Sequence, residues 1–173
     1  MFTNMNILDE KHLIVLNTIV EEKNIHIREI ARKSGLSASY VCKAVKDLEK
    51  YGLIEKRSNG RNVTYTPNED SFLLAEIKKL LVLINLYPLV ERIRDKCYRI
   101  ILFGSAARGE YEKHSDIDLL IVSENAMEVK KYLSENVMGK KLSVIILRKR
   151  EYLSLRKRDP VFWKEVNRGI VLK

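Results

Sequence analysis

Apolar residues recur with the period of a helix along the first fifty positions. Positions 13, 16, 19 and 20 share one side of a helix over residues 9–22. Gly35 ends a second helical stretch as a C-cap glycine does, and Ser37 precedes a third as an N-cap. The pattern predicts helices at 9–22, 29–34 and 37–50. Residues 25–27 fit either a strand or the entry of a helix.

Two strand-like segments follow, at 53–57 and 62–66. The dipeptide Asn59-Gly60 lies between them and is typical of a hairpin turn, because both residues tolerate positive φ. A long helix is expected at 70–86, where the apolar positions 73, 74, 77, 80, 81 and 84 form one stripe. Pro88 is expected to start a separate helix that runs to residue 96.

In the remaining chain, apolar strands alternate with helices. The expected strands are 99–103, 117–122 and 142–147. The expected helices are a short one opened by Ser105, then 127–136, 151–158 and 160–168. Such an order is typical of an α/β layer structure in which helices cover a sheet.

The composition excludes several classes of protein. The 173 residues are 46% hydrophobic, with seven Gly and three Pro, which excludes wholesale disorder and collagen-like chains. The longest apolar run, residues 80–84, is far shorter than the about 20 residues that span a bilayer. No basic and apolar leader opens the sequence, and Cys42 and Cys97 lack metal-ligand spacing. We therefore expect reduced thiols and a cytoplasmic protein without a membrane partner.

Positive charge dominates: 32 Lys and Arg face 23 Asp and Glu, a net charge of +9. Residues 24–66 contain nine basic and four acidic residues, so they hold more than half of this surplus. A nucleic acid is the first expected partner, although a basic surface also serves solubility alone. Residues 148–158 form a second basic run, for which a solvated helix face is the commoner meaning.

Residues 27–66 read IREIARKSGLSASYVCKAVKDLEKYGLIEKRSNGRNVTYT. Two short helices, a glycine-containing turn and a basic hairpin resemble a winged helix-turn-helix domain of MarR-like and ArsR-like regulators. The resemblance implies a domain that binds double-stranded DNA, often as a homodimer, with its second helix in the major groove. The alternative to DNA binding is a winged-helix module that binds proteins and has a merely solvated basic face. The candidate DNA-binding residues are Ser37, Ser39, Tyr40, Lys43 and Lys46 of the helix and Arg57 and Arg61 of the hairpin.

The most specific motif spans residues 100–122 and reads IILFGSAARGEYEKHSDIDLLIV. Gly-Ser followed at a set distance by Asp-x-Asp between two apolar strands resembles the minimal nucleotidyltransferases of the polymerase-beta superfamily. Asp116 and Asp118 are two residues apart on an extended segment, so their side chains should face the same side. Mg²⁺ prefers such carboxylate oxygens as ligands, and we expect it to bind between them. We expect Gly104, Ser105 and Arg108 to contact a nucleoside triphosphate, with Ser105 as the cap of the next helix. The alternative role for Arg108 is an ion pair with an acidic residue.

The expected site lacks one acidic residue that the resemblance implies. In this superfamily a third carboxylate usually comes from a later strand, and here Ser143 stands in its place. Glu124 and Glu151 are candidate substitutes, although neither lies within an expected strand. Because a general base contributes about 10²–10⁴ in rate, we expect nucleotide binding with weak or no transfer activity.

The expected organisation is a two-domain chain: a winged helix (α+β) at 1–68, linking or dimerising helices at 69–97, and an α/β nucleotidyltransferase-like domain at 98–173. The leading hypothesis is a transcriptional regulator whose second domain binds Mg²⁺ and a nucleotide. The alternatives are an active nucleotidyltransferase acting on a protein, an RNA or a small molecule, and an antitoxin-like partner of a small helical toxin.

Overall fold

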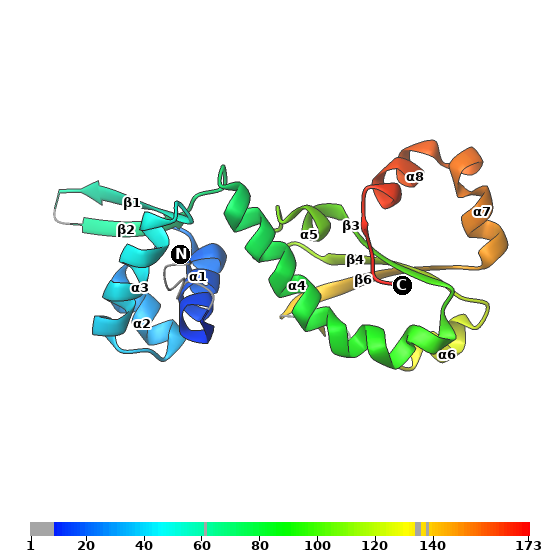
Figure 1. Cartoon of the computed structure of the whole chain (residues 1–173), viewed down its shortest axis with the longest axis horizontal. Helices are drawn as coiled ribbons and strands as arrows, with labels where there is room; N and C mark the ends of the chain where they lie inside the picture. Colours follow the sequence, from blue (N-terminus) through cyan, green and yellow to red (C-terminus); the bar gives the residue numbers. More distant parts are fainter. Residues whose placement is uncertain (1–8, 61, 134–135, 138) are drawn as a thin grey trace, which may run out of the picture. The chain divides into compact units, whose positions relative to one another are not determined.

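The computed structural model describes residues 9–60, 62–133, 136–137 and 139–173 (Figure 1). The chain divides into two compact units, Met1–Leu74 and Ala75–Lys173. None of the described helices is a candidate for crossing a bilayer, because none holds an apolar window of the required length.

The first unit contains three helices and a two-stranded hairpin. The helices are α1 (Glu10–Glu22), α2 (Ile27–Ser34) and α3 (Ala38–Lys50), and the strands are β1 (Ile54–Asn59) and β2 (Asn62–Pro67). Local signals set the helix ends: the Asp9 and Ser37 side chains accept hydrogen bonds from the first turns of α1 and α3, and Gly35 ends α2 with φ 71°. The core of this unit is aliphatic and includes Val15, Leu16, Ile19, Ile30, Val41, Ala44, Val45 and Leu48.

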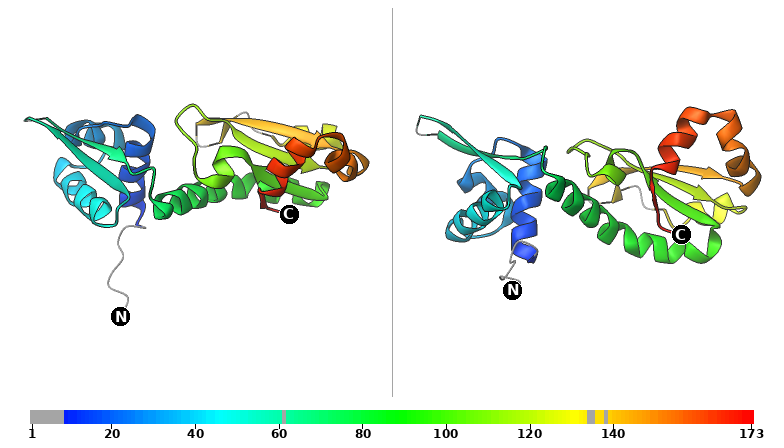
Figure 2. Two further views of the ribbon diagram at one scale, coloured as in Figure 1. Left: turned by 90° about the horizontal axis from the view of Figure 1, so that it is seen from above. Right: turned by 45° about the horizontal axis from the view of Figure 1, so that its top comes forward.

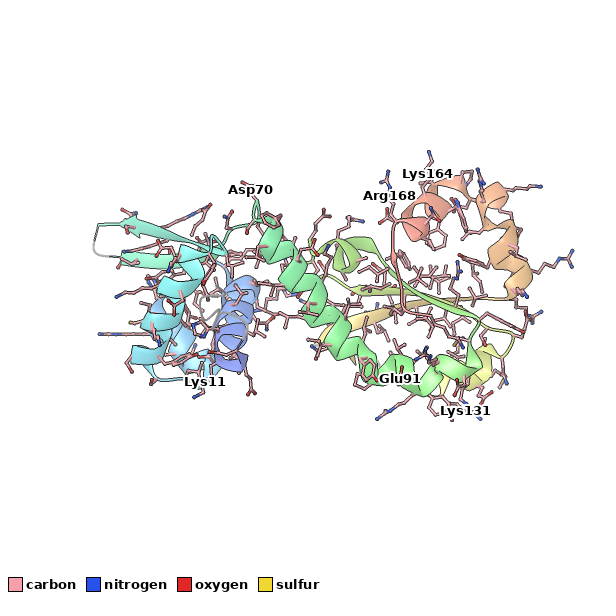
Figure 3. All side chains as sticks on the ribbon, in the orientation of Figure 1. Lys11, Asp70, Glu91, Lys131, Lys164 and Arg168 are labelled. Carbon is pink, nitrogen blue, oxygen red and sulfur yellow. The ribbon has the colours of Figure 1, made fainter. Side chains whose placement is uncertain are left out.

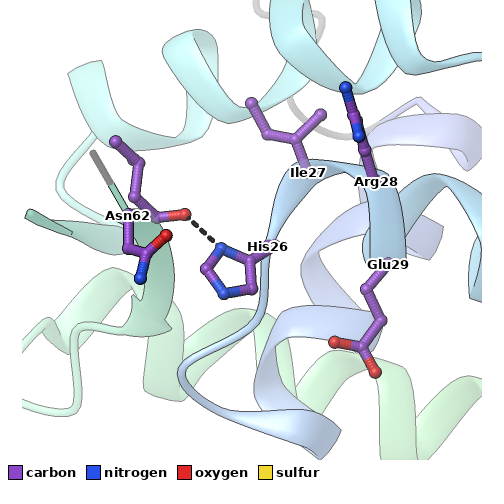
Figure 4. Close-up of a pocket in the computed structure, with 6 residues that line it drawn as sticks. His26, Ile27, Arg28, Glu29 and Asn62 are labelled. Atoms are coloured by element: carbon purple, nitrogen blue, oxygen red, sulfur yellow. Dashed lines mark hydrogen bonds between the residues drawn. The ribbon is translucent and has the colours of Figure 1, made fainter.

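The hairpin is longer than the sequence predicts. Asn59 pairs with Asn62, so the strands extend to the turn itself. An isolated bridge joins Ile25 to Tyr65, which resolves the ambiguous segment: Ile25 pairs with β2, and α2 begins two residues later. Next to this bridge the Nδ1 atom of His26 lies 2.7 Å from the Val63 carbonyl oxygen, at a hollow of about 620 Å³ that Arg28 and Asn62 also line (Figure 4).

A continuous helix, α4 (Phe72–Ile93), replaces the two helices expected around Pro88. Proline removes one intrahelical hydrogen bond, which leaves the Ile84 carbonyl without its usual partner. Ile84 and Pro88 are exposed, so water can satisfy that carbonyl, while the buried Leu86 and Leu89 hold the backbone on either side. The prediction of a break was therefore wrong, and a short 3-10 helix (Arg94–Lys96) follows α4.

The expected apolar stripe of this helix is also only partly correct. Leu74 and Ile77 are buried, but Leu80 and Ile84 are 47% and 56% exposed, and Val82 is fully buried instead. From Val82 onward the buried residues Leu86, Leu89 and Ile93 lie on the opposite side of the helix from Leu80 and Ile84, where they join the core of the second unit. Dimerisation through this helix stays a prediction.

The second unit is built on a five-stranded mixed sheet in the order β5-β6-β4-β3-β7 (Figure 2). Strands β4 and β6 are parallel, and the other neighbours are antiparallel. The strands are β3 (Arg99–Phe103), β4 (Ile117–Val122), β5 (Asn136–Val137), β6 (Lys140–Leu147) and β7 (Ile170–Val171). The helices are α5 (Gly104–Arg108), α6 (Ala126–Lys130), α7 (Lys149–Arg158) and α8 (Pro160–Asn167).

Two separate apolar clusters cover the two faces of this sheet. Ile100, Leu102, Leu119 and Ile121 face α4, α5 and α6 in one cluster. The alternate strand residues, with Leu120 and Val122 among them, face α7 and α8 in the other. The three main strands lie where the apolar pattern predicts them, but β5 and β7, which have two residues each, were not predicted. The helix predicted at 127–136 is too long, because α6 ends at Lys130. Two-residue strands carry too little alternation to be recognised.

Candidate functional site

Asp116 and Asp118 lie where β4 begins. Asp116 directly precedes the strand, and Asp118 is its second residue. Because alternate residues of a strand share a face, Asp118 lies on the same face as Leu120 and Val122, which is the face covered by α7 and α8. In the sheet, Asp118 is opposite Phe103 of β3 and Ser143 of β6.

Gly104 approaches this carboxylate closely. It follows β3 with φ +72°, and a Cβ atom at this position would lie 2.5 Å from Oδ2 of Asp118. Both the backbone conformation and the contact therefore require glycine here. The result is a backbone segment in direct contact with an acidic side chain at the ends of two neighbouring strands.

The surroundings of Asp118 disfavour its negative charge. Burial raises the pKa of this carboxyl, and the charges of Asp116 and Glu165 raise it further, whereas the hydrogen bond with Ser143 acts in the opposite direction. A carboxyl in such surroundings is stabilised by a proton or by a cation.

The donor set at this point fits a hard divalent cation only in part. Asp116 and Asp118 supply carboxylate oxygens, which Mg²⁺ prefers, and Mg²⁺ usually takes one or two carboxylates and completes its shell with water and phosphate oxygens. Among the described residues no group of three or more His, Cys, Asp or Glu side chains is arranged to hold a metal by itself. The two carboxylates are therefore suited to a cation that arrives with a phosphate ligand.

Ser143 occupies the position expected for the third acid. Strand β6 runs parallel to β4 and places Ser143 directly beside Asp118, and the described residues of β6 include no carboxylate. Glu124 and Glu151 cannot substitute. Both follow the carboxyl ends of their neighbouring parallel strands, at the end of the sheet opposite Asp118, where they accept backbone hydrogen bonds from Lys149 and Arg148.

A buried lysine fixes the loop that leads to Asp116. Nζ of Lys140 donates to the carbonyl oxygens of Glu112 and Lys113 at 2.8 and 2.9 Å. Its ammonium also lies 5.2 Å from the centre of the buried Tyr111 ring. No sequence pattern predicts this contact, because Lys140 precedes the expected start of its strand and a lysine at such a position is usually exposed. His114 of the same loop is exposed.

Arg108 is held by two carboxylates. Its Nε donates to Glu110 and its Nη1 to Glu165, each at 2.6 Å, and these hydrogen bonds raise the pKa of the guanidinium. Glu165 belongs to α8, 57 residues away. No spacing motif connects Glu165 to the Gly-Ser segment, so no local pattern predicts this contact.

The role expected for Ser105 as a helix cap is wrong. Helix α5 begins one residue earlier, at Gly104, with Phe103 at the N-cap position and no capping side chain. Although the φ of Gly104 is left-handed, α5 includes this residue, so Ser105 lies inside the first turn and caps no amide among the described residues.

The candidate DNA-binding residues of α3 separate into two groups. Ser39, Lys43 and Lys46 are exposed, and the Ser37 hydroxyl accepts from the Tyr40 amide while it shares a hydrogen bond with Ser39. Tyr40 turns back toward α1, which differs from its expected place on the outer face.

Tyr40 belongs to a polar cluster in the first unit. Its hydroxyl lies 3.2 Å from Oδ1 of Asp9 and 2.9 Å from Nδ1 of His12, a ring that is 2% exposed. Nε2 of His12 faces Asp47 at 3.4 Å. Burial and the Asp9 charge raise the pKa of Tyr40. This cluster joins α1 to α3, so Tyr40 has a structural partner that its sequence position did not suggest.

The basic residues of the hairpin and of the last two helices lie at the surface. Arg57 is exposed and lies 3.5 Å from Glu55, whereas Arg61 is outside the described residues. In the second unit the side chains of Lys164, within α8, and Arg168, at its C-terminal end, are exposed (Figure 3). The cations of α7 are exposed as well: Lys149, Arg150, Arg156, Lys157 and Arg158.

Comparisons with known proteins match the two parts of the chain separately. Residues 7–70 match a family model described only as HVO_A0114. A solved structure from Sulfolobus solfataricus, described as "a putative nucleotidyltransferase", is 19% identical and has a TM-score of 0.40 over 59% of this chain and 88% of that one.

Two proteins of Methanocaldococcus jannaschii match short segments. "Putative protein adenylyltransferase MJ0141" is 57% identical over 30 residues, 17% of this chain and 30% of that protein. "Putative protein adenylyltransferase MJ0604" is 53% identical over 36 residues, 21% of this chain and 36% of that protein. The chain thus spans about a third of the length of these curated relatives. Residues 86–167 match the family model "Nucleotidyltransferase domain", and this match covers the part of the chain that carries Gly104, Asp116 and Asp118.

Proposed function

We propose that the second unit binds a nucleoside triphosphate together with Mg²⁺ and transfers its nucleotidyl group slowly or not at all. The observation that carries this proposal is the contact between Gly104 and Asp118, which puts a half-buried backbone turn beside an acidic pair in the part of the chain that matches the nucleotidyltransferase model. A bound cation would neutralise phosphate charge. Asp116 and Asp118 would hold it, and Gly104 would leave room for the phosphates.

The weakness of the transfer step follows from Ser143. A serine hydroxyl beside Asp118 does not accept a proton from an attacking hydroxyl at neutral pH as a carboxylate does. The site therefore keeps its means of binding and lacks a general base from β6.

Calorimetric titration of the full chain with Mg-ATP and Mg-GTP tests the binding. We expect a Kd in the micromolar range for at least one of them, and a loss of at least about tenfold in Asp118→Asn, since the cation loses half of its carboxylates. Absence of heat and of thermal stabilisation with both nucleotides would refute the proposal.

We further propose that the first unit is a winged helix that binds double-stranded DNA, which makes the chain a regulator. The three helices, the hairpin with its Gly60 turn and the exposed Lys43 and Lys46 of α3 support this proposal. A fluorescence titration with duplex DNA at two salt concentrations tests it. Each phosphate contact contributes about 0.9 to the slope of log K against log salt.

Protein adenylylation is the second candidate function, because both Methanocaldococcus proteins are named for it. Incubation of the chain with cell extract and ATP labelled at the α-phosphate tests this candidate. Label transferred to a protein by the wild type and lost in Asp118→Ala supports it, whereas label independent of Asp118 excludes this site as its source.

A further inference from the structure

The Arg108 guanidinium connects two sides of the sheet. Helix α5, which carries Arg108, packs with the cluster on one face, and α8, which carries Glu165, packs with the cluster on the other. The bond from Nη1 of Arg108 to Oε1 of Glu165 joins them around the end of β3. Glu110, two residues from Arg108, takes the Nε donor.

The two carboxylates that hold Arg108 differ in their relation to Asp118. Glu165 belongs to α8, which covers the sheet face on which Asp118 lies, and its charge adds to burial in raising the pKa of Asp118. Glu110 follows α5, which packs on the other face of the sheet. Glu165 is thus the carboxylate that contacts the arginine from the side of the acidic pair.

Such an arrangement affects a triphosphate and a cation in opposite ways. A free triphosphate meets three carboxylates, Asp116, Asp118 and Glu165, and an arginine whose Nε and Nη1 donors are already engaged. Phosphate competes with carboxylate for the same guanidinium donors. A divalent cation, in contrast, gains from every additional negative charge near the pair.

We propose that Glu165 is a specificity-determining residue of this site, which favours the cation-bound form of a nucleoside triphosphate over the free anion. It does so because it occupies the Arg108 guanidinium and adds a negative charge beside Asp118. This proposal rests on the proposed nucleotide site.

The test is a set of calorimetric titrations of the full chain with three probes: Mn²⁺ alone, ATP in EDTA, and Mg-ATP. In Glu165→Gln we expect ATP in EDTA to bind about fivefold tighter and Mn²⁺ about fivefold weaker, because the variant removes one charge and frees one guanidinium donor. Glu165→Asp keeps the charge and should return Mn²⁺ affinity toward that of the wild type.

Glu110→Gln is the matched control. It also frees one donor of Arg108, but Glu110 follows α5 on the other face of the sheet from Asp118, so Mn²⁺ affinity should stay within about twofold of the wild type. Circular dichroism and the melting temperature establish that each variant is folded. Should Glu165→Gln not fold, Glu165→Asp and Arg108→Lys are titrated in its place, and Arg108→Lys should weaken ATP in EDTA without weakening Mn²⁺.

The outcomes separate the two proposals. If the wild type binds Mg-ATP but Glu165→Gln leaves both Mn²⁺ and free ATP unchanged, or shifts both in the same direction, the role of Glu165 is refuted and the nucleotide site stands. If the wild type binds neither Mg-ATP nor Mn²⁺, the nucleotide site itself is refuted, and the role of Glu165 with it.

Discussion

Ser143 on β6 lies directly beside Asp118 on β4, in register, and its side chain favours the charged form of that carboxylate. A residue on a parallel neighbour strand, in register, is a fixed distance of about 4.8 Å away in the backbone, so any side chain placed there meets the same carboxylate. This relationship makes the position of a missing acid directly testable.

Ser143→Asp is expected to increase transfer activity. The new carboxylate adds a cation ligand and a general base, a contribution of about 10²–10⁴ in rate where the geometry suits it. Label transfer from ATP measures the change, and Ser143→Ala is the control that removes the hydroxyl without adding charge. Equal rates in the two variants would contradict the assignment of this position.

Asp118→Asn is expected to stabilise the chain at neutral pH when no cation is present. A carboxyl whose pKa is raised on folding contributes stability below its unfolded pKa, near 3.8, and loses that contribution as pH rises through its folded pKa. At pH 7 the wild type carries this charge at a cost that the variant avoids, so the melting temperature of the variant should be higher. The difference should disappear near pH 3, as thermal melts at both pH values would show.

Gly104→Ala is expected to destabilise the second unit by about 2–4 kcal/mol, through left-handed backbone strain and the clash with Asp118. Gly139→Ala is its matched control. Gly139 has φ +69° and open space around a Cβ atom, so only the backbone term of about 1 kcal/mol applies. Chemical denaturation measures both, and equal losses would show that the Gly104 contact is not tight.

Tyr40→Phe is expected to weaken folding and leave DNA binding intact. The variant removes the hydroxyl that bonds Asp9 and His12, a loss of about 1 kcal/mol, while the exposed Lys43 stays in place. Lys43→Ala should do the reverse, with reduced DNA affinity at unchanged stability. Denaturation curves and DNA titrations of both variants check this contrast, which fails if Tyr40→Phe binds DNA more weakly than Lys43→Ala.

The extent to which the sequence predicts this structure depends on the range of the contacts. Local signals such as Ser37, Gly35 and Asn59-Gly60 place the helix ends and the hairpin turn, and the alternation of β4 puts Asp118 on the face of Leu120 and Val122. These features need only neighbours along the chain.

The contacts that complete the site are long-range. Glu165 reaches Arg108 across 57 residues and Lys140 reaches the loop of Glu112 across 28, and neither contact has a periodic or spacing signature. At Pro88 the local signal for the start of a new helix is misleading. The buried side chains on either side keep α4 continuous through this residue.

Strand β7 has a consequence for aggregation. Its residues Ile170 and Val171 pair with Leu102 and Ile101 of β3, and the Lys173 carbonyl accepts the Ile100 amide. An unprotected edge strand offers free amides and carbonyls to other molecules. Because β3 leads straight into Gly104, this short closing strand shields the strand that supports the site from intermolecular pairing.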